Sequence, residues 1–162
     1  MKRLFIIALL LVSTAMTAEV NIPEITEILK QVETNHNPKA LGDYNEDGIP
    51  LSYGILQIKQ IAIDDVNRRY KTYYKHSDAF IVECAEEIFE LYTGMWANHL
   101  EKKEGRKATA EDIVRIWNGG PNGYKRKSTI GYLLKYKNYR YLWKTKTWEI
   151  IEDFAQSKVL RA

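Results

Sequence analysis

The chain has 162 residues, of which 24 are lysine or arginine, 21 are aspartate or glutamate and one is cysteine. This length is enough for one domain with one hydrophobic core. A lone cysteine excludes an intrachain disulfide, so packing must stabilise the fold. No Gly/Ser-rich linker, internal repeat or low-complexity run divides the chain.

The charges are unevenly distributed along the chain. Residues 19–101 carry 7 basic and 15 acidic residues, a net charge of −8, whereas residues 102–162 carry 15 and 6, a net charge of +9. The basic half could face an anionic polymer, such as a cell-wall glycan or a nucleic acid. Pairing with the acidic half is the simpler interpretation, and the lysines and arginines form no nucleic-acid recognition motif. We therefore expect no nucleic-acid partner.

The N-terminal stretch MKRLFIIALLLVSTAMTA has the pattern of a secretory signal peptide. Lys2 and Arg3 precede a short apolar run, and Ala15 and Ala18 are candidate cleavage positions. The sequence predicts a signal peptide over residues 1–18, a single domain over residues 19–162, and export to the periplasm or the extracellular space. We expect no stable membrane anchor after the signal peptide is removed. The alternative is that residues 1–18 remain as an uncleaved N-terminal anchor.

The first predicted helix begins near Asn21 and places its apolar residues on one face. Its apolar positions are Ile25, Ile28, Leu29 and Val32, with the i, i+3, i+4, i+7 spacing of an amphipathic helix. Glu33 follows the last of them, and the helix should end before Pro38. Turn residues and a short apolar run then predict a small β-hairpin lobe over residues 40–58.

The rest of the chain is predicted to be helical. We expect helices over residues 60–75 and 78–103, a further helix that begins near Thr109, a loop over residues 118–123, and helices over residues 128–138 and 146–158. An aromatic-rich segment with Tyr139, Tyr141 and Trp143 should join the last two. The expected fold class is therefore α+β and mostly α, with one small β lobe after the first helix.

Four sequence blocks resemble the SLT-type lytic transglycosylases, which are related to goose-type lysozyme. They are VETNHNP with Glu33, SYGILQI with Gly54 and Gln57, RIWNGGPNGY with Asn118, and STIGYLLKY with Tyr132. Their order and approximate spacing agree with that family. The resemblance implies a lysozyme-like single domain that acts on the glycan strands of peptidoglycan.

The resemblance also implies roles for individual residues. Glu33 would be the general acid and base, because a carboxylic acid in an apolar setting can protonate the leaving oxygen of a glycosidic bond. The substrate-binding residues would be Thr34, Gly54, Gln57, Asn118 and Tyr132. The alternative for Glu33 is an ordinary exposed glutamate at a helix end. Four of the others also have plain structural alternatives: a strand bend for Gly54, a polar edge residue for Gln57, a turn residue for Asn118 and a core tyrosine for Tyr132. Trp117 is expected to pack.

The second carboxylate distinguishes two mechanisms. A hydrolase needs one to activate water, whereas a lytic transglycosylase closes a 1,6-anhydro ring with a single Glu. Asp43 and Asp47 are candidates, but Lys59 occupies a position at which goose-type lysozymes carry an acid. We therefore expect a transglycosylase that cleaves the MurNAc-GlcNAc β-1,4 bond. The alternatives are a hydrolytic muramidase, such as a phage lysin, and a non-catalytic wall-binding module.

No cofactor is expected. Asp43-Tyr-Asn45-Glu-Asp47-Gly48 matches the first half of a calcium loop, but Gly54 stands where that loop needs a bidentate acid. A weak calcium site and a solvated acidic turn both remain open interpretations. The three histidines lack the spacing of a zinc site, so we assign no metal. We expect a monomer.

Overall fold

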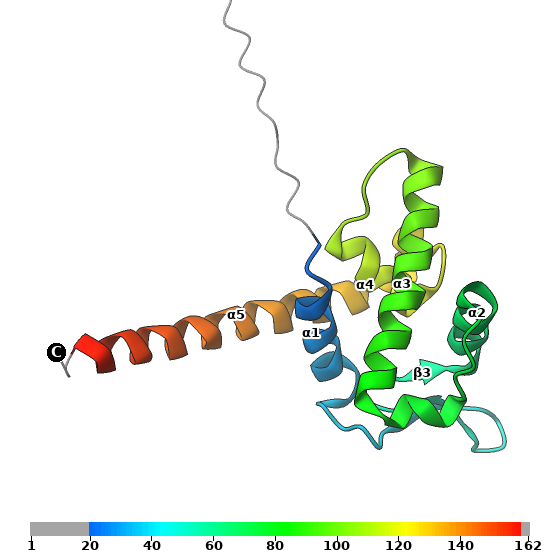
Figure 1. Cartoon of the computed structure of the whole chain (residues 1–162), viewed down its shortest axis with the longest axis horizontal. Coiled ribbons are helices and arrows are strands. Elements are labelled where there is room, and N and C mark those ends of the chain that lie inside the picture. The colour runs from blue at the N-terminus through cyan, green and yellow to red at the C-terminus, as the bar shows by residue number, and fades with distance from the viewer. Residues whose placement is uncertain (1–19, 160–162) are drawn as a thin grey trace, which may run out of the picture.

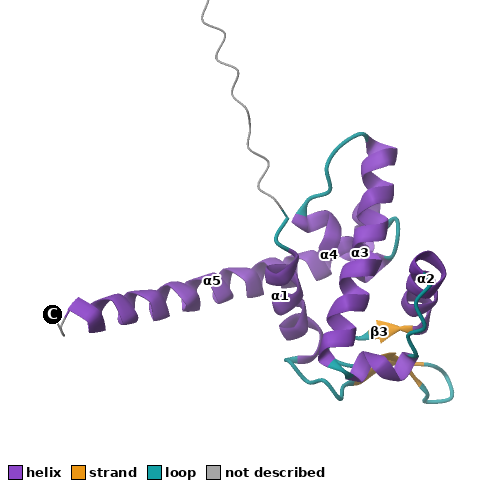
Figure 2. Cartoon of the chain, in the orientation of Figure 1, coloured by secondary structure: helices purple, strands orange, loops and turns teal. Residues whose placement is uncertain are grey.

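The computed structural model describes residues 20–159, with side chains up to residue 147, and shows a mostly helical protein with one small sheet (Figures 1 and 2). This confirms the predicted fold class. The predicted signal peptide lies outside the described residues. Within the described part, no helix combines the length and the apolar character needed to span a membrane. The main elements are α1 (Ile22–Thr34), β1 (Leu41–Tyr44), β2 (Pro50–Tyr53), β3 (Ile58–Lys59), α2 (Gln60–Tyr70), α3 (Val82–Glu104), α4 (Ala110–Gly119) and α5 (Ile130–Val159).

Local signals define both ends of α1. The side-chain oxygen of Asn21 accepts a hydrogen bond of 3.1 Å from the backbone N–H of Glu24, which satisfies one of the free donors of the first turn. Asn35 takes a left-handed conformation, with φ of 54°, and ends the helix. Ile28 and Leu29 are buried in the core. Because this face packs inward, the last turn of α1 brings Glu33 next to the sheet.

The sheet is antiparallel, with the strand order β1-β2-β3. Asn45 shapes the turn between β1 and β2, because its side-chain oxygen accepts hydrogen bonds from the backbone N–H groups of Asp47, at 3.1 Å, and Ile49, at 2.8 Å. The calcium-like pattern thus has a structural explanation as turn chemistry. In the described part of the chain, no three His, Cys, Asp or Glu residues gather into a group that could hold a metal ion.

Gly54 connects β2 to the segment before β3, and its backbone touches a neighbouring 3₁₀ helix (His76–Phe80). Gly54 has φ of +74°, and a Cβ atom built there would lie 1.7 Å from the carbonyl oxygen of Ala79. Only a residue without a side chain fits this contact. Packing therefore accounts for the glycine at this position, and Gly54 is not among the residues that line the cleft described below. Its predicted contact with substrate stays a prediction.

Replacing Gly54 with Ala is expected to destabilise the protein by at least about 2 kcal/mol, because both the left-handed φ and the backbone collision must be relieved. Gly48→Ala is the matched control. Gly48 has a similar φ of +76°, but nothing lies within 4 Å of its added Cβ. Urea unfolding should show the smaller loss for Gly48→Ala, and equal losses would contradict the packing role of Gly54.

Several of the predicted helix boundaries are wrong. The helix expected over residues 78–103 begins at Val82, after the 3₁₀ helix, and the loop expected from residue 118 begins after Gly119. The helix expected over residues 60–75 ends at Tyr70, because Lys71 takes a left-handed conformation. The two helices expected over residues 128–138 and 146–158 are one helix, α5, which extends away from the body of the protein (Figure 1). The aromatic segment between them contains no glycine or proline, so nothing in it interrupts the helix. An ion pair between Arg140 and Glu24 of α1, at 2.6 Å, holds this segment beside the core.

Candidate active site

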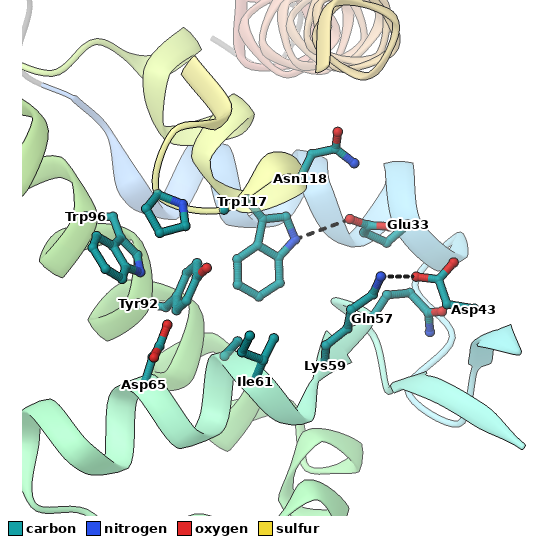
Figure 3. Close-up of a pocket in the computed structure, with 13 residues that line it drawn as sticks. Glu33, Asp43, Gln57, Lys59, Ile61, Asp65, Tyr92, Trp96, Trp117 and Asn118 are labelled. Carbon is teal, nitrogen blue, oxygen red and sulfur yellow. Dashed lines mark hydrogen bonds and ion pairs between the residues drawn. The ribbon is translucent and has the colours of Figure 1, made fainter. Parts of the chain in front are cut away.

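A cleft of about 440 Å³ lies where the end of α1, the sheet, α2, α3 and α4 meet (Figure 3). Charged and polar side chains from α1 and the sheet lie at one end, and aromatic side chains from α3 and α4 lie toward the other (Figure 3). The lining residues are Glu33, Asp43, Gln57, Lys59, Ile61, Ala62, Asp65, Tyr92, Trp96, Trp117, Asn118, Gly120 and Pro121. The structure thus brings Glu33, Asp43, Gln57 and Asn118 together in one cleft.

The carboxylate of Glu33 is held by two neutral hydrogen-bond donors. The indole N–H of Trp117 donates to Oε1 at 3.2 Å, and the hydroxyl of Tyr132 donates to the same oxygen at 2.5 Å. No described residue forms a hydrogen bond with Oε2. Oε1 is therefore fixed by the protein, and Oε2 is the oxygen that can carry a proton to a ligand.

The pKa of Glu33 is raised, chiefly because burial penalises the charged carboxylate. The hydrogen bonds from Tyr132 and Trp117 and the positive charge of Lys135 lower the pKa but do not cancel this effect, and the charge of Asp43 raises it further. The Lys135 ammonium itself donates to the backbone carbonyl of Val32 at 2.6 Å. Glu33 therefore keeps its proton to higher pH than an exposed glutamate, as a general acid requires.

Trp117 and Tyr132 have more direct contacts with the candidate acid than the sequence indicated. Trp117 packs edge-on against Phe89, with ring centroids 4.9 Å apart, and this contact holds its indole N–H toward Glu33. Burial and the nearby Glu33 charge raise the pKa of Tyr132 well above its usual value, so its hydroxyl remains a donor. Tyr132 contacts Glu33 and is not among the residues that line the cleft. Its predicted contact with substrate stays a prediction.

Replacing Tyr132 with Phe is expected to raise the pKa of Glu33 further, because a hydrogen bond that favours the charged form is lost. If Glu33 acts as the acid, the alkaline limb of the kcat/KM profile should move upward by about one pH unit, since a hydrogen bond to a charged group contributes about 1.5–3 kcal/mol. The measurement is the pH dependence of initial rates of glycan cleavage.

The matched control for this change is Tyr136→Phe. Tyr136 lies one turn further along α5, and its buried hydroxyl has no hydrogen-bond partner among the described residues. Its removal should leave the alkaline limb in place. An unchanged limb in the Tyr132→Phe variant would contradict the assignment of the hydrogen bond to ionised Glu33.

Thr34 and Gln57 form hydrogen bonds that connect the segments around the cleft. The hydroxyl of Thr34 donates to the carbonyl of Ile55 at 2.9 Å, which ties the end of α1 to the segment before β3. Gln57 accepts a hydrogen bond from Ser52 at 2.9 Å and donates to the carbonyl of Gly54 at 3.0 Å. Gln57 lines the cleft, whereas Thr34 does not. Direct contact of either residue with substrate stays a prediction.

Asn118 and the two candidate acids differ in their exposure to the cleft. Asn118, near the end of α4, is exposed and lines it, in agreement with a ligand-contacting amide. Asp43 also lines it and forms an ion pair of 2.8 Å with Lys59. Asp47 is exposed in the hairpin turn and is not among the lining residues. Of the two candidates for a second carboxylate, the structure brings Asp43 to Glu33.

The fold and the cleft define a lysozyme-like protein, and comparison with known proteins leads to the same class. The chain is 29% identical over 141 residues to a lysozyme of Ostrea edulis, covering 85% of this chain and 95% of that protein. No protein-family model matches the chain.

Solved structures show the same likeness. The lysozyme of Meretrix lusoria, in its complex with the inhibitor PliI of Aeromonas hydrophila, superposes with a TM-score of 0.58 at 26% identity, covering 74% of this chain and 89% of that chain. A second structure of inhibitor-bound Meretrix lusoria lysozyme gives the same values. Both similar proteins are lysozymes, which are glycosidases, and neither is a lytic transglycosylase. The expected lysozyme-like fold is confirmed.

Proposed function

We propose that this protein is a hydrolytic lysozyme that cleaves the β-1,4 glycosidic bond between MurNAc and GlcNAc in peptidoglycan. The observation that carries the proposal is the arrangement of Glu33, a partly buried carboxyl with a raised pKa, in a cleft that Asp43 also lines. The similarity to lysozymes over most of the chain supports it.

Each carboxyl has a separate role in this reaction. Glu33 donates its proton to the glycosidic oxygen as the bond from that oxygen to the anomeric carbon breaks. Asp43 accepts a proton from water as the water oxygen attacks the anomeric carbon. Asp43 then carries the proton taken from water while Glu33 is ionised, and proton exchange with solvent restores both groups. Asn118, at the rim of the cleft, hydrogen-bonds the glycan.

A lytic transglycosylase, which the sequence motifs favoured, is the second candidate. Glu33 alone would then act first as acid and next as base, and the sugar's own hydroxyl would form a 1,6-anhydro end. The position of Asp43 in the cleft and the lysozyme relatives support hydrolysis instead. A wall-binding module without activity would have no use for a partly buried acid with a raised pKa.

We further propose that the protein is exported and acts as a single domain. The signal-like residues 1–18 support export, after which residues 19–162 would meet peptidoglycan outside the cytoplasm. The similarity to the lysozyme of Ostrea edulis covers 85% of this chain, which supports one lysozyme-like domain.

Mass spectrometry of purified peptidoglycan digested with residues 19–162 tests the proposed reaction. Fragments with reducing MurNAc ends, absent from a Glu33→Gln digest, are the expected result. Fragments with 1,6-anhydro ends would overturn hydrolysis in favour of the transglycosylase. Intact glycan after both digests would overturn the enzymatic function and favour a wall-binding module.

A further inference from the structure

We propose that Lys59 is a positioning residue for Asp43, holding its carboxylate in the orientation that accepts a proton from water. This inference rests on the proposed hydrolytic function. Lys59 lines the same cleft, and its ammonium lies 2.8 Å from Oδ2 of Asp43. Figure 3 shows this pair beside Gln57, on the side of the cleft where Glu33 lies.

Lys59 occupies a position that local helix energetics disfavour. It is the residue that caps the N-terminus of α2, where Ser, Thr, Asp and Asn are preferred. Its side chain forms no capping hydrogen bond, and its positive charge faces the positive end of the helix dipole. A lysine at this position does not stabilise the helix. The interaction that the structure shows for its side chain is the ion pair with Asp43.

Asp43 also departs from ordinary local geometry. It has φ of 49° within β1, a left-handed conformation that is uncommon for a residue other than glycine. Its neighbour Gly42 packs tightly on Gln57, because a Cβ atom at Gly42 would lie 2.1 Å from the Gln57 side-chain oxygen. The backbone before Asp43 is thus held by packing. Strained residues of this kind are concentrated at functional sites.

The two carboxylates of the site face different partners. Glu33 is hydrogen-bonded by neutral donors, whereas Asp43 is paired with a cation. The ammonium of Lys59 contacts Oδ2 of Asp43, and Oδ1 has no hydrogen-bond partner among the described residues. Oδ1 is therefore the oxygen available to water. The remaining acid that lines the cleft, Asp65, forms an ion pair with Arg68 instead.

A double-mutant cycle tests this coupling on purified peptidoglycan. The variants are Lys59→Met, Asp43→Asn, the double variant and Lys59→Arg, with kcat and KM measured for each. We expect Lys59→Met to lower kcat about tenfold at an almost unchanged KM, and to have little further effect in the Asp43→Asn background. Lys59→Arg should recover most of kcat, because an arginine can also pair with the carboxylate.

Controls separate this role from folding and from a nonspecific charge effect. The pair is exposed, since the Lys59 and Asp43 side chains are 53% and 58% accessible, so Lys59→Met should leave the unfolding midpoint nearly unchanged. Lys39→Met, at a lysine outside the lining of the cleft, should leave kcat unchanged.

The following results would overturn the inference. Equal losses from Lys59→Met in the native and Asp43→Asn backgrounds, or a raised KM with kcat retained, would show that Lys59 acts independently of Asp43. An unchanged kcat in Lys59→Met, or no recovery in Lys59→Arg, would also contradict it. Failure of the proposed function is distinguishable, because the native protein would then release 1,6-anhydro ends instead of reducing ends, or would be no more active than Glu33→Gln.

Discussion

The Glu33→Gln variant is expected to lose about three to four orders of magnitude in the rate of glycan cleavage, because the amide cannot donate the proton that the leaving oxygen needs. Its side-chain oxygen can still accept the hydrogen bonds that Trp117 and Tyr132 give to Oε1 of the native residue. The variant should therefore fold and bind glycan as the native protein does. Initial rates on peptidoglycan measure the loss of cleavage, and circular dichroism measures whether the variant folds.

The same variant should become more stable than the native protein as the pH rises. The pKa of Glu33 is raised above its usual value of 4.5, so ionisation costs more in the folded state than in the unfolded state. The native protein therefore loses stability as the pH rises through the raised pKa, whereas the Gln variant does not. Below 4.5 the pH dependence of the two unfolding free energies should coincide.

Two outcomes would contradict the role assigned to Glu33. Retained cleavage by Glu33→Gln would show that another group supplies the proton. A stability difference that does not change with pH would show that burial does not disfavour the ionised carboxylate. Urea unfolding of both proteins at several pH values gives the comparison.

The Asp43→Asn variant is expected to lose about two to three orders of magnitude in kcat, because an amide accepts a proton from water far more weakly than a carboxylate. Asp43 is exposed, so the loss of its ion pair with Lys59 should change the unfolding free energy by less than about 1 kcal/mol. The measurements are kcat on peptidoglycan and the unfolding midpoint of the same preparation.

Asp47→Asn is the matched control for this change. Asp47 belongs to the same hairpin but lies in the turn and does not line the cleft, so its replacement should leave kcat unchanged. Full activity of Asp43→Asn with 1,6-anhydro products would instead indicate a transglycosylase. A comparable loss of kcat in both variants would contradict the role assigned to Asp43 in the cleft.

Much of the fold follows from local sequence patterns. Asn21 and the apolar spacing of the first helix predicted α1, and the turn residues predicted the small sheet, because caps, periodicity and turns involve neighbours along the chain. The continuous helix α5 was missed because aromatic residues were interpreted as a join. A segment without glycine or proline can continue a helix. In α5 the ion pair between Arg140 and Glu24 also holds this segment against α1.

The sequence by itself determined that the chain can form a mostly helical domain with a small sheet and that Glu33 is the candidate acid. Only the tertiary structure decided which groups surround that acid. Trp117 and Tyr132 lie 84 and 99 residues from Glu33, yet both donate to one of its oxygens. The choice of Asp43 over Asp47 likewise depends on where the hairpin meets α1 and α2. Such contacts arise from packing between distant segments, which no local period or motif encodes.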